Sequence, residues 1–205
     1  MVNPKIRTGT QKDVAVLTEI IRSSFRDVAD RFGLTQENCP THPSSCTVDW
    51  VQRDMDRGVF YFILEDDGLA SGCVALEPAG SDLCYLERLA VRPPQRHRGF
   101  GRALVEYVLA ESKRFDARRV NIGIIAEQTE LKNWYQKIGF VEAETKEFAH
   151  LPSRVTFMSF AVNPSCQPSV LETGGGSKKS CQRDAETIAK GAAQERLAKK
   201  VYSSA

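Results

Sequence analysis

The sequence has no long apolar run and almost no excess of charge of either sign. A membrane-spanning helix needs about 20 consecutive apolar residues, and no stretch of the chain approaches that length. Lysine and arginine number 28 against 26 aspartates and glutamates, which leaves a net charge of +2. A nucleic-acid-binding domain usually carries a strong basic excess or a basic stripe. We therefore expect no membrane partner, and the charge balance argues against nucleic acid.

The first residues also lack the apolar segment of a secretory signal. The six cysteines are therefore expected to be reduced thiols of a cytoplasmic protein. Cys39, His42 and Cys46 are three potential soft-metal ligands in one polar loop, but a fourth ligand at a recognised spacing is missing. We expect no metal, and we expect this loop to connect two helices or to contribute to a substrate pocket.

Two common nucleotide-binding signatures are absent as well, G-x-x-x-x-G-K-[ST] and G-x-G-x-x-G. In their place, residues 96–104 read Arg-His-Arg-Gly-Phe-Gly-Arg-Ala-Leu after an apolar run at 83–91. This pattern predicts a strand, a glycine-containing turn and a helix. Gly99 and Gly101 let backbone N–H groups approach a ligand, and a helix start adds unpaired donors and the positive end of the helix dipole. The turn therefore predicts an anion site, with a diphosphate as its natural ligand.

Basic side chains crowd this turn: Arg92, Arg96, His97, Arg98 and Arg102 lie within eleven residues. Their density is a second indication of an anion, because like charges repel and a purely structural turn does not need them. A plain strand-to-helix connection stays the alternative, since two glycines separated by one residue also occur in turns that bind nothing.

The remaining pattern predicts helices and strands in alternation. Apolar residues at three- and four-residue steps predict a helix from Thr10 to Gly33, and Thr47 is expected to cap a shorter helix. Residues 66–68 (Asp-Asp-Gly) predict a hairpin turn, and Gly72 predicts a bulge or a close backbone approach. Further strands are expected at 6–8, 59–64, 69–76, 83–91, 120–125, 140–148 and 154–162, and further helices at 103–116 and 128–138.

The strand at 83–91 is expected to pair in parallel with the strand at 120–125, because a right-handed crossover helix buries both. Regular alternation along this strand places five side chains on one face, namely Leu83, Tyr85, Glu87, Leu89 and Val91. Glu87 is then a carboxylate among apolar neighbours, which can raise its pKa and suit it to proton transfer. A surface ion pair with a nearby arginine is the alternative.

A chain of 205 residues with 41% hydrophobic content can hold one globular domain and an extension. The patterned region ends near residue 163, so we expect a domain at 1–163 and a flexible, basic extension at 164–205. A glycine- and serine-containing stretch at 173–180, with few apolar residues after it, is typical of disorder. Residues 172–205 contain seven lysines and arginines against four acidic residues, so a partner or nucleic-acid contact stays a minor alternative there.

The order of these elements resembles the GNAT superfamily of acyl-CoA-dependent N-acetyltransferases. The resemblance covers residues 5–162 and is carried by the strand at 85–91, by R-x-x-G-x-G at 96–101 and by Y-x-K-x-G-F at 135–140. It implies an α/β fold with a mixed, splayed sheet of six or seven strands and about four flanking helices. It also implies acetyl-CoA as the acyl donor, and no metal.

The resemblance further implies roles for single residues. The coenzyme pyrophosphate would bind backbone N–H groups at 96–102, and the pantetheine arm would pair with the backbone of the preceding strand. The implied coenzyme contacts are Leu89, Ala90, Val91, Arg96, His97, Arg98, Gly99, Phe100, Gly101 and Arg102, with Gln128 where many relatives have asparagine.

Two side chains are implied for proton transfer. Glu87 is the expected general base, directly or through water, and Tyr85 holds the alternative position for this base. Tyr135 matches the general acid that often protonates the departing thiolate in this family. A tyrosine of the core, packed with Trp134 and Phe140, is the alternative interpretation.

The predicted activity is transfer of an acetyl group from acetyl-CoA to a primary amine by direct attack in a ternary complex. A non-catalytic acyl-CoA sensor is the alternative. The acceptor pocket is expected from residues 25–58 and 145–156, and its ligand stays open among polyamine, amino acid, aminoglycoside, protein N-terminus and lysine side chain. A homodimer, common among relatives, stays open too.

Overall fold

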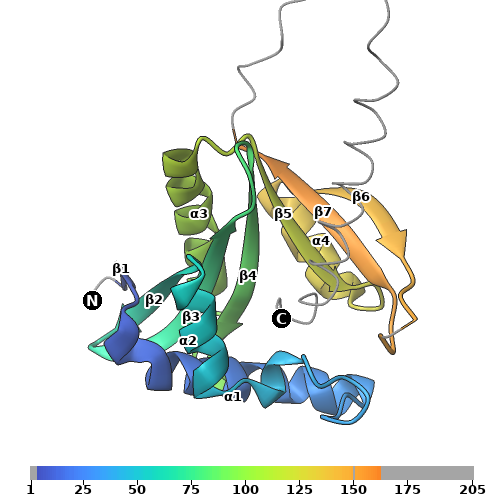
Figure 1. The fold of residues 1–205 in the computed structure, drawn as a ribbon, viewed down its shortest axis with the longest axis horizontal. Helices are drawn as coiled ribbons and strands as arrows, with labels where there is room; N and C mark the ends of the chain where they lie inside the picture. Colours follow the sequence, from blue (N-terminus) through green and yellow to red (C-terminus); the bar gives the residue numbers. More distant parts are fainter. Residues whose placement is uncertain (1–3, 150, 163–205) are drawn as a thin grey trace, which may run out of the picture.

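A computed structural model describes residues 4–149 and 151–162 of the chain. Within these residues, seven strands form one mixed sheet in the order β1-β2-β3-β4-β5-β7-β6 (Figure 1). The strands are β1 (Lys5–Thr8), β2 (Phe60–Asp66), β3 (Leu69–Pro78), β4 (Leu83–Val91), β5 (Arg119–Ile125), β6 (Val141–Lys146) and β7 (Val155–Ala161). The α-helices are α1 (Val14–Phe32), α2 (Val48–Asp56), α3 (Phe100–Glu111) and α4 (Thr129–Ile138). The predicted α/β fold with a mixed sheet is confirmed.

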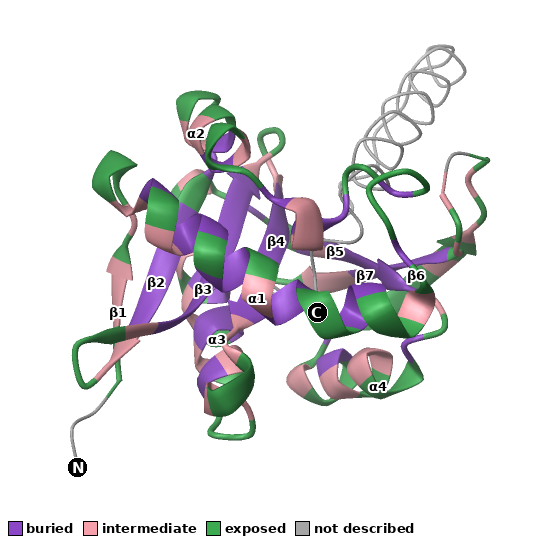
Figure 2. Cartoon of the chain, turned by 90° about the horizontal axis from the view of Figure 1, so that it is seen from below, coloured by how far each residue is buried: buried purple, intermediate pink, exposed green. Residues whose placement is uncertain are grey.

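Helices cover the sheet from both sides (Figures 1 and 2). α1 and α2 pack on one face of β2, β3 and β4, where Leu17, Ile21 and Phe25 of α1 are completely buried. α3 and α4 pack on the other face and form a second apolar cluster with the sheet. α1 ends at Gly33, which adopts a φ of 61°, a left-handed conformation that glycine adopts without strain. The sheet is therefore buried from both sides at β4.

The hairpin between β2 and β3 agrees with the predicted turn. Asp67 and Gly68 have φ values of 51° and 76°, as a two-residue turn matched to the strand twist requires. A Cβ on Gly72 would lie 2.9 Å from the backbone oxygen of Ala90 in β4. The predicted close approach at Gly72 is therefore confirmed, and a register shift lies opposite it at Leu64.

The sheet opens between β4 and β5. These strands pair in parallel only from Leu83 to Tyr85 of β4, against Arg119 to Asn121 of β5. Beyond Tyr85, β4 has no pairing with β5 in the register of the described strands, while β5 continues along β7 in antiparallel register. The expected parallel pairing and the expected splay are both confirmed. The second half of β4 therefore has an open edge.

A bulge in β4 corrects the predicted alternation of side chains. Ala75 of β3 lies opposite Glu87, whereas Cys73 lies opposite Ala90, so two residues of β4 stand against one of β3. Arg88 takes up the extra residue with a φ of 54°. Leu89 consequently joins the apolar cluster beneath α3, while Ala90 faces α1. The prediction that Glu87, Leu89 and Val91 share one face was wrong, because a bulge leaves no mark in an alternating apolar pattern.

The last described strand ends at Ala161, next to the predicted domain boundary. The predicted extension at 164–205 lies outside the described residues. Among the residues that the structure describes, none of the helices combines the length and the apolar character needed to cross a bilayer.

Candidate functional site

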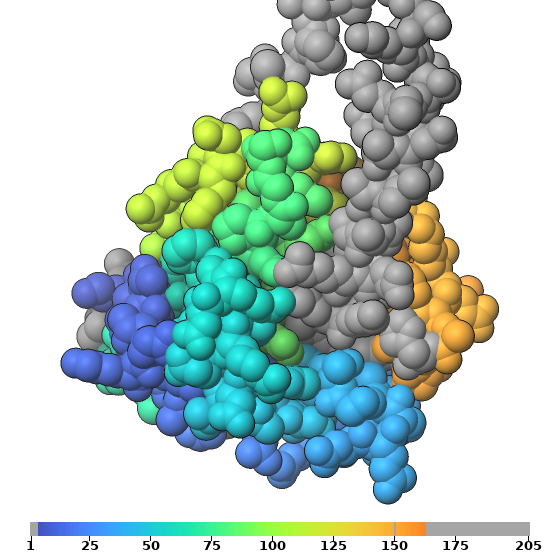
Figure 3. Space-filling view, viewed as in Figure 1, coloured from blue at the N-terminus to red at the C-terminus, as the bar shows by residue number. Residues whose placement is uncertain are grey.

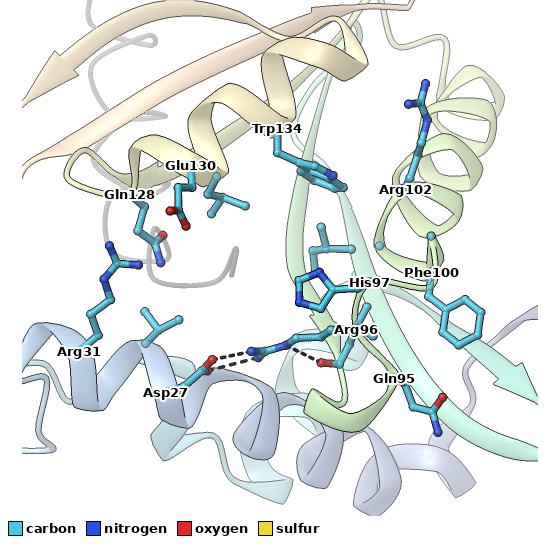
Figure 4. Close-up of a pocket in the computed structure, with 16 residues that line it drawn as sticks. Asp27, Arg31, Gln95, Arg96, His97, Phe100, Arg102, Gln128, Glu130 and Trp134 are labelled. Carbon is cyan, nitrogen blue, oxygen red and sulfur yellow. Dashed lines mark hydrogen bonds and ion pairs between the residues drawn. The ribbon is translucent and has the colours of Figure 1, made fainter.

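A cavity of about 450 Å³ lies at the open edge of β4. Figure 4 shows its walls, which come from four parts of the chain. The floor is β4, one side is the turn that leads into α3, and α1 and α4 close the remaining sides. The lining residues used below are Asp27 and Arg31 of α1, Leu89 and Val91 of β4, residues 95–102 of the turn, and Gln128 and Trp134 of α4.

The turn before α3 presents a run of unoccupied backbone donors. His97 and Gly99 both adopt left-handed conformations, with φ values of 61° and 83°. Within the described chain, none of the backbone N–H groups of residues 97–102 donates to a protein acceptor, and the next one, on Ala103, donates to Gly99 O at 3.0 Å. Successive N–H groups in such a turn form an anion-binding concavity, and the start of α3 adds its positive dipole end. The predicted anion site has the required donors.

The arginines around this turn have partners that the sequence did not reveal. Each forms an ion pair with a carboxylate. The pairs are Arg92–Glu19 at 2.8 Å, Arg96–Asp27 at 2.5 Å, Arg98–Asp66 at 2.7 Å and Arg102–Glu106 at 2.8 Å. The density of arginines is therefore a weaker indication of a bound anion, because these carboxylates already offset the repulsion between the arginines. Three of the pairs instead tie the turn and the strand end to α1 and to β2.

Arg96 shows this cross-linking most clearly. Its guanidinium contacts both carboxylate oxygens of Asp27 and donates to the backbone oxygen of Ser24 at 2.6 Å, while its Nε donates to Val91 O at 3.3 Å (Figure 4). The pKa of Asp27 is lowered, chiefly because Arg96 donates a hydrogen bond to it. Arg96 therefore connects the end of β4, the turn and α1.

Gln128 occupies the N-cap position of α4, yet its side chain does not cap the helix. It is 8% exposed and points into the cavity (Figure 4). Its Oε1 accepts no hydrogen bond in the described chain. A buried polar atom of this kind is normally paired, so Gln128 is suited to accept an N–H donor from a bound ligand.

The opposite face of β4 carries a buried group of charges beneath α2. Asp54 accepts hydrogen bonds from Arg57 at 2.5 Å and from the Tyr61 hydroxyl at 2.8 Å, and it lies 3.5 Å from a guanidinium nitrogen of Arg88. Arg57 also lies 3.7 Å from Glu77. Glu87, opposite Ala75 in the sheet register, belongs to this face and is buried.

This environment corrects the expectation of apolar neighbours around Glu87. Burial lowers the pKa of Arg57, but the charges of Asp54, Glu77 and Glu87 outweigh burial and raise it. Burial also acts on Arg88, and the charges around it, including that of Glu87, raise its pKa above the ordinary value. The charge of Glu87 therefore acts on two guanidinium groups, those of Arg57 and Arg88.

The loop at 33–47 covers the same region. Figure 3 shows α1, this loop and α2 as one continuous stretch of surface along the lower edge of the molecule. His42 is buried, and its pKa is lowered to about 4 by burial and by the charge of Arg88. Burial raises the pKa values of Cys39 and Cys46 to about 11, so neither is a ready metal ligand. In the described part of the chain, no three His, Cys, Asp or Glu side chains are grouped to hold a metal ion.

Comparison with known proteins assigns this arrangement to a family. The model of the "Acetyltransferase (GNAT) family" matches residues 19–140. The chain belongs to the GNAT acetyltransferase family. It is therefore an acyltransferase of the class that uses acetyl-CoA as co-substrate, and the predicted resemblance is confirmed.

Individual GNAT relatives are distant. An amino-acid acetyltransferase of Azotobacter vinelandii is 30% identical over 138 residues, which are 66% of this chain and 27% of that protein. The chain thus spans about a quarter of that relative's length. An uncharacterised N-acetyltransferase in the pepI 3' region of Lactobacillus delbrueckii is 24% identical over 152 residues, covering 68% of this chain and 85% of that protein.

Solved structures show the same fold. The putative acetyltransferase yncA of Salmonella typhimurium, determined with acetyl-CoA, has a TM-score of 0.62 at 18% identity, over 82% of this chain and 99% of that one. The ribosomal-protein-S18-alanine N-acetyltransferase of Escherichia coli has a TM-score of 0.65 at 15% identity, over 82% and 100%.

Tyr135, the predicted GNAT acid, lies in the core beside the cavity. It is completely buried, and its ring packs edge-on against Trp134 at 4.8 Å and Phe140 at 5.2 Å between centroids. Neither Tyr135 nor Glu87 belongs to the cavity wall, whereas Leu89, Val91 and Gln128 do. The aromatic packing considered as an alternative is present, and the catalytic role of Tyr135 stays a prediction.

Sequence reasoning missed several residues of the site. Asp27, Arg31 and Trp134 line the cavity, but nothing in their local pattern distinguishes them from ordinary helix residues. Arg88 did carry a signal, because it is a charge within an otherwise apolar part of β4. Its side chain stacks on Trp50 of α2, with the guanidinium carbon 5.2 Å from the ring centroid.

Proposed function

We propose that this chain transfers an acetyl group from acetyl-CoA to a primary amine by direct attack in a ternary complex. The observation that carries the proposal is the run of unoccupied backbone N–H groups at 97–102, placed at the mouth of a cavity along the open edge of β4. A diphosphate fits the first feature, and an extended amide-bearing arm fits the second. The coenzyme, when bound, supplies an activated thioester.

The coenzyme contacts follow from this placement. The backbone N–H groups of His97, Arg98, Gly99, Phe100, Gly101 and Arg102 would hold the pyrophosphate, whereas that of Arg96 already donates to Pro93 O at 3.3 Å. The backbone of Leu89, Ala90 and Val91 would pair with the pantetheine arm, since β5 leaves that edge open. Gln128 would accept one amide N–H, which is supported by its buried and unpaired oxygen.

Glu87 is proposed as the general base. An amine is mostly protonated at neutral pH and must lose a proton before it can attack a thioester. Its support is the position of this carboxylate, which is buried on β4 and interacts with the charges of Arg57 and Arg88. Tyr85, also buried on β4, stays the alternative residue for relaying this proton.

Tyr135 is proposed as the acid that protonates the departing thiolate. A phenol is a suitable donor to a thiolate. Packing between Trp134 and Phe140 holds the ring in one orientation, which is what a positioned proton donor requires.

The names of two relatives suggest two acceptor classes, free amino acids and a protein N-terminal alanine. Both are primary amines. We also propose a cytoplasmic location for the chain and a domain limit near residue 163. The location is supported by four buried cysteines that form no disulfides in the described chain, and the limit by the last strand, which ends at Ala161.

The proposal is tested by the release of free thiol from acetyl-CoA in the presence of pooled amines. We expect thiol release that depends on both enzyme and amine, and a large loss of activity in Glu87→Gln and Tyr135→Phe with coenzyme binding retained. A chain that binds coenzyme A but releases no thiol with any amine would be a sensor instead. Full activity in both variants would remove the two residue assignments.

A further inference from the structure

Arg88 is a buried charge with too few partners. Arg88 is 6% exposed, and its side chain lies in the layer between β4 and α2. A guanidinium has five N–H donors, yet Nε and Nη1 of Arg88 have no hydrogen-bond partner among the residues that the structure describes. Its one carboxylate, Asp54, lies 3.5 Å from Nη2 and already accepts from Arg57 and Tyr61. A buried charge is strongly unfavourable unless it is paired and hydrogen-bonded, so Arg88 is suited to receive a further anion.

The bulge of β4 places Arg88 beside the proposed base. Without the extra residue, the side chains of Glu87 and Arg88 would project from opposite faces of the strand. In the structure Arg88 stacks on Trp50 of α2, and Glu87 shares the register position of Ala75, which packs in the α1 and α2 cluster. Both side chains therefore lie on the same face of the sheet. Glu87 supplies a carboxylate there and Arg88 a cation.

Further polar groups lie around this pair. The imidazole of His42 accepts from the Ser44 N–H through Nδ1 at 3.3 Å. Its pKa of about 4 keeps the ring neutral above that pH. Glu77, held near Arg57 at 3.7 Å, provides a second carboxylate besides Glu87.

We propose that the acceptor is an α-amino acid whose carboxylate binds Arg88 while its amino group is deprotonated at Glu87. Adjacent residues of opposite charge match a molecule whose ammonium and carboxylate groups are separated by a single carbon atom. A polyamine or a lysine side chain offers no anion beside its amine, and a protein N-terminus has an uncharged amide where the carboxylate would be. This inference rests on the proposed acetyl transfer and assigns its acceptor class.

The test compares common L-amino acids with their α-carboxamides as acceptors in the thiol-release assay. The two series differ only in the anion, and losing a partner of a buried charge typically lowers kcat/KM by about 30-fold to 1000-fold. We expect that preference in the wild-type chain and its loss in Arg88→Met. Arg88→Lys, which keeps the charge without the planar fork, should retain part of it. Arg53→Met, which removes an exposed arginine of α2, the helix that packs over Arg88, is the matched control and should keep the preference.

Three results would overturn the inference. The first is equal use of amino acids and amides by the wild-type chain. The second is an equal loss for both series in Arg88→Met, which would make Arg88 a structural residue. The third applies where the chain acetylates no amine and the proposed function fails, and it is a Tm that amino acids and amides change equally. Thermal unfolding with coenzyme A present then decides, since amino acids but not amides should raise Tm in the wild type and not in Arg88→Met.

Discussion

The two faces of β4 hold their charges in different ways. On the coenzyme side, each arginine of the turn has a carboxylate partner of its own, and the unoccupied donors are backbone N–H groups. On the other side, one carboxylate, Asp54, serves Arg57, Tyr61 and Arg88 together. A well-paired charge fixes the position of the backbone around it, whereas a poorly paired, buried one is suited to bind a ligand. The arginines at the turn are therefore already paired with carboxylates, and the less well paired Arg88 is the stronger candidate for binding a further anion.

Replacing the proposed base should have the largest effect on this comparison. Glu87→Gln removes the proton acceptor but keeps the size and most of the polarity of the side chain. We expect kcat/KM for the amine to fall by about 10²- to 10⁴-fold, with coenzyme A binding by calorimetry within about twofold, because Glu87 lies on the face opposite the coenzyme contacts. A parallel loss of coenzyme binding would show that the two faces are not independent.

His42 provides a second test of the buried face, through stability. Its folded pKa of about 4 lies below the ordinary value of 6.5, so between pH 6.5 and 4 the unfolded chain binds a proton that the folded chain does not. Stability is then fully present above pH 6.5 and falls by about 1.4 kcal/mol per pH unit down to pH 4, or roughly 3 kcal/mol in all.

Chemical denaturation at several pH values checks this prediction. His42→Gln should flatten the decline between pH 6.5 and 4. His97→Gln, which replaces an exposed histidine on the coenzyme side, serves as the control and should leave the decline in place. An unchanged pH dependence in His42→Gln would mean that the buried face carries no such proton linkage.

The local elements were predictable because their signals are local. The apolar stripe of α1 and its stop at Gly33, the Asp67–Gly68 turn and the donor-rich start of α3 each follow from a few neighbouring residues. Even the close approach at Gly72 was visible, because a glycine inside a strand has few other reasons to be there.

The charges were not predictable, because their partners are far away in sequence. Arg96 pairs with Asp27 on α1, which lies 69 residues earlier. Only the folded chain brings this helix and the turn of Arg96 together. The bulge at Arg88 is equally hidden, since the apolar residues around it fit a regular strand as well as a bulged one. Sequence reasoning therefore singled out the turn and its arginines, but it could not show which carboxylates pair with them.

Gly101 tests the coenzyme side by filling space. A Cβ at this position would lie 3.6 Å from the Trp134 ring and 3.9 Å from Val91, so a larger side chain projects into the cavity between two of its walls. Gly101→Val should raise the Kd for coenzyme A by about 10- to 100-fold, as overpacking of a site typically does. Tm should not fall, because valine is a better helix residue than glycine.

The matched control for this prediction is Gly101→Ala. Its single methyl group makes only ordinary contacts and should change the Kd by less than about threefold. If valine and alanine act alike, or if neither affects Kd, coenzyme A does not pass between Trp134 and Val91.

The smallest expected effect decides what the turn arginines do. If Arg96 acts as a clamp on α1, then Arg96→Met and Asp27→Asn should each weaken coenzyme A binding by about two- to fivefold, the range of a partly exposed ion pair. The double variant should be no worse than Arg96→Met alone, because the ion pair is already lost in that variant.

A direct role of Arg96 in phosphate binding predicts the opposite for its partner. Asp27→Asn would then free the guanidinium from a competing carboxylate and would tighten binding, most of all at low salt. The sign of the change in Asp27→Asn therefore separates the two roles, even though its size is small. The geometry favours weakening, because Arg96 also donates to the backbone oxygens of Ser24 and Val91, contacts that orient the turn whether or not an anion is present.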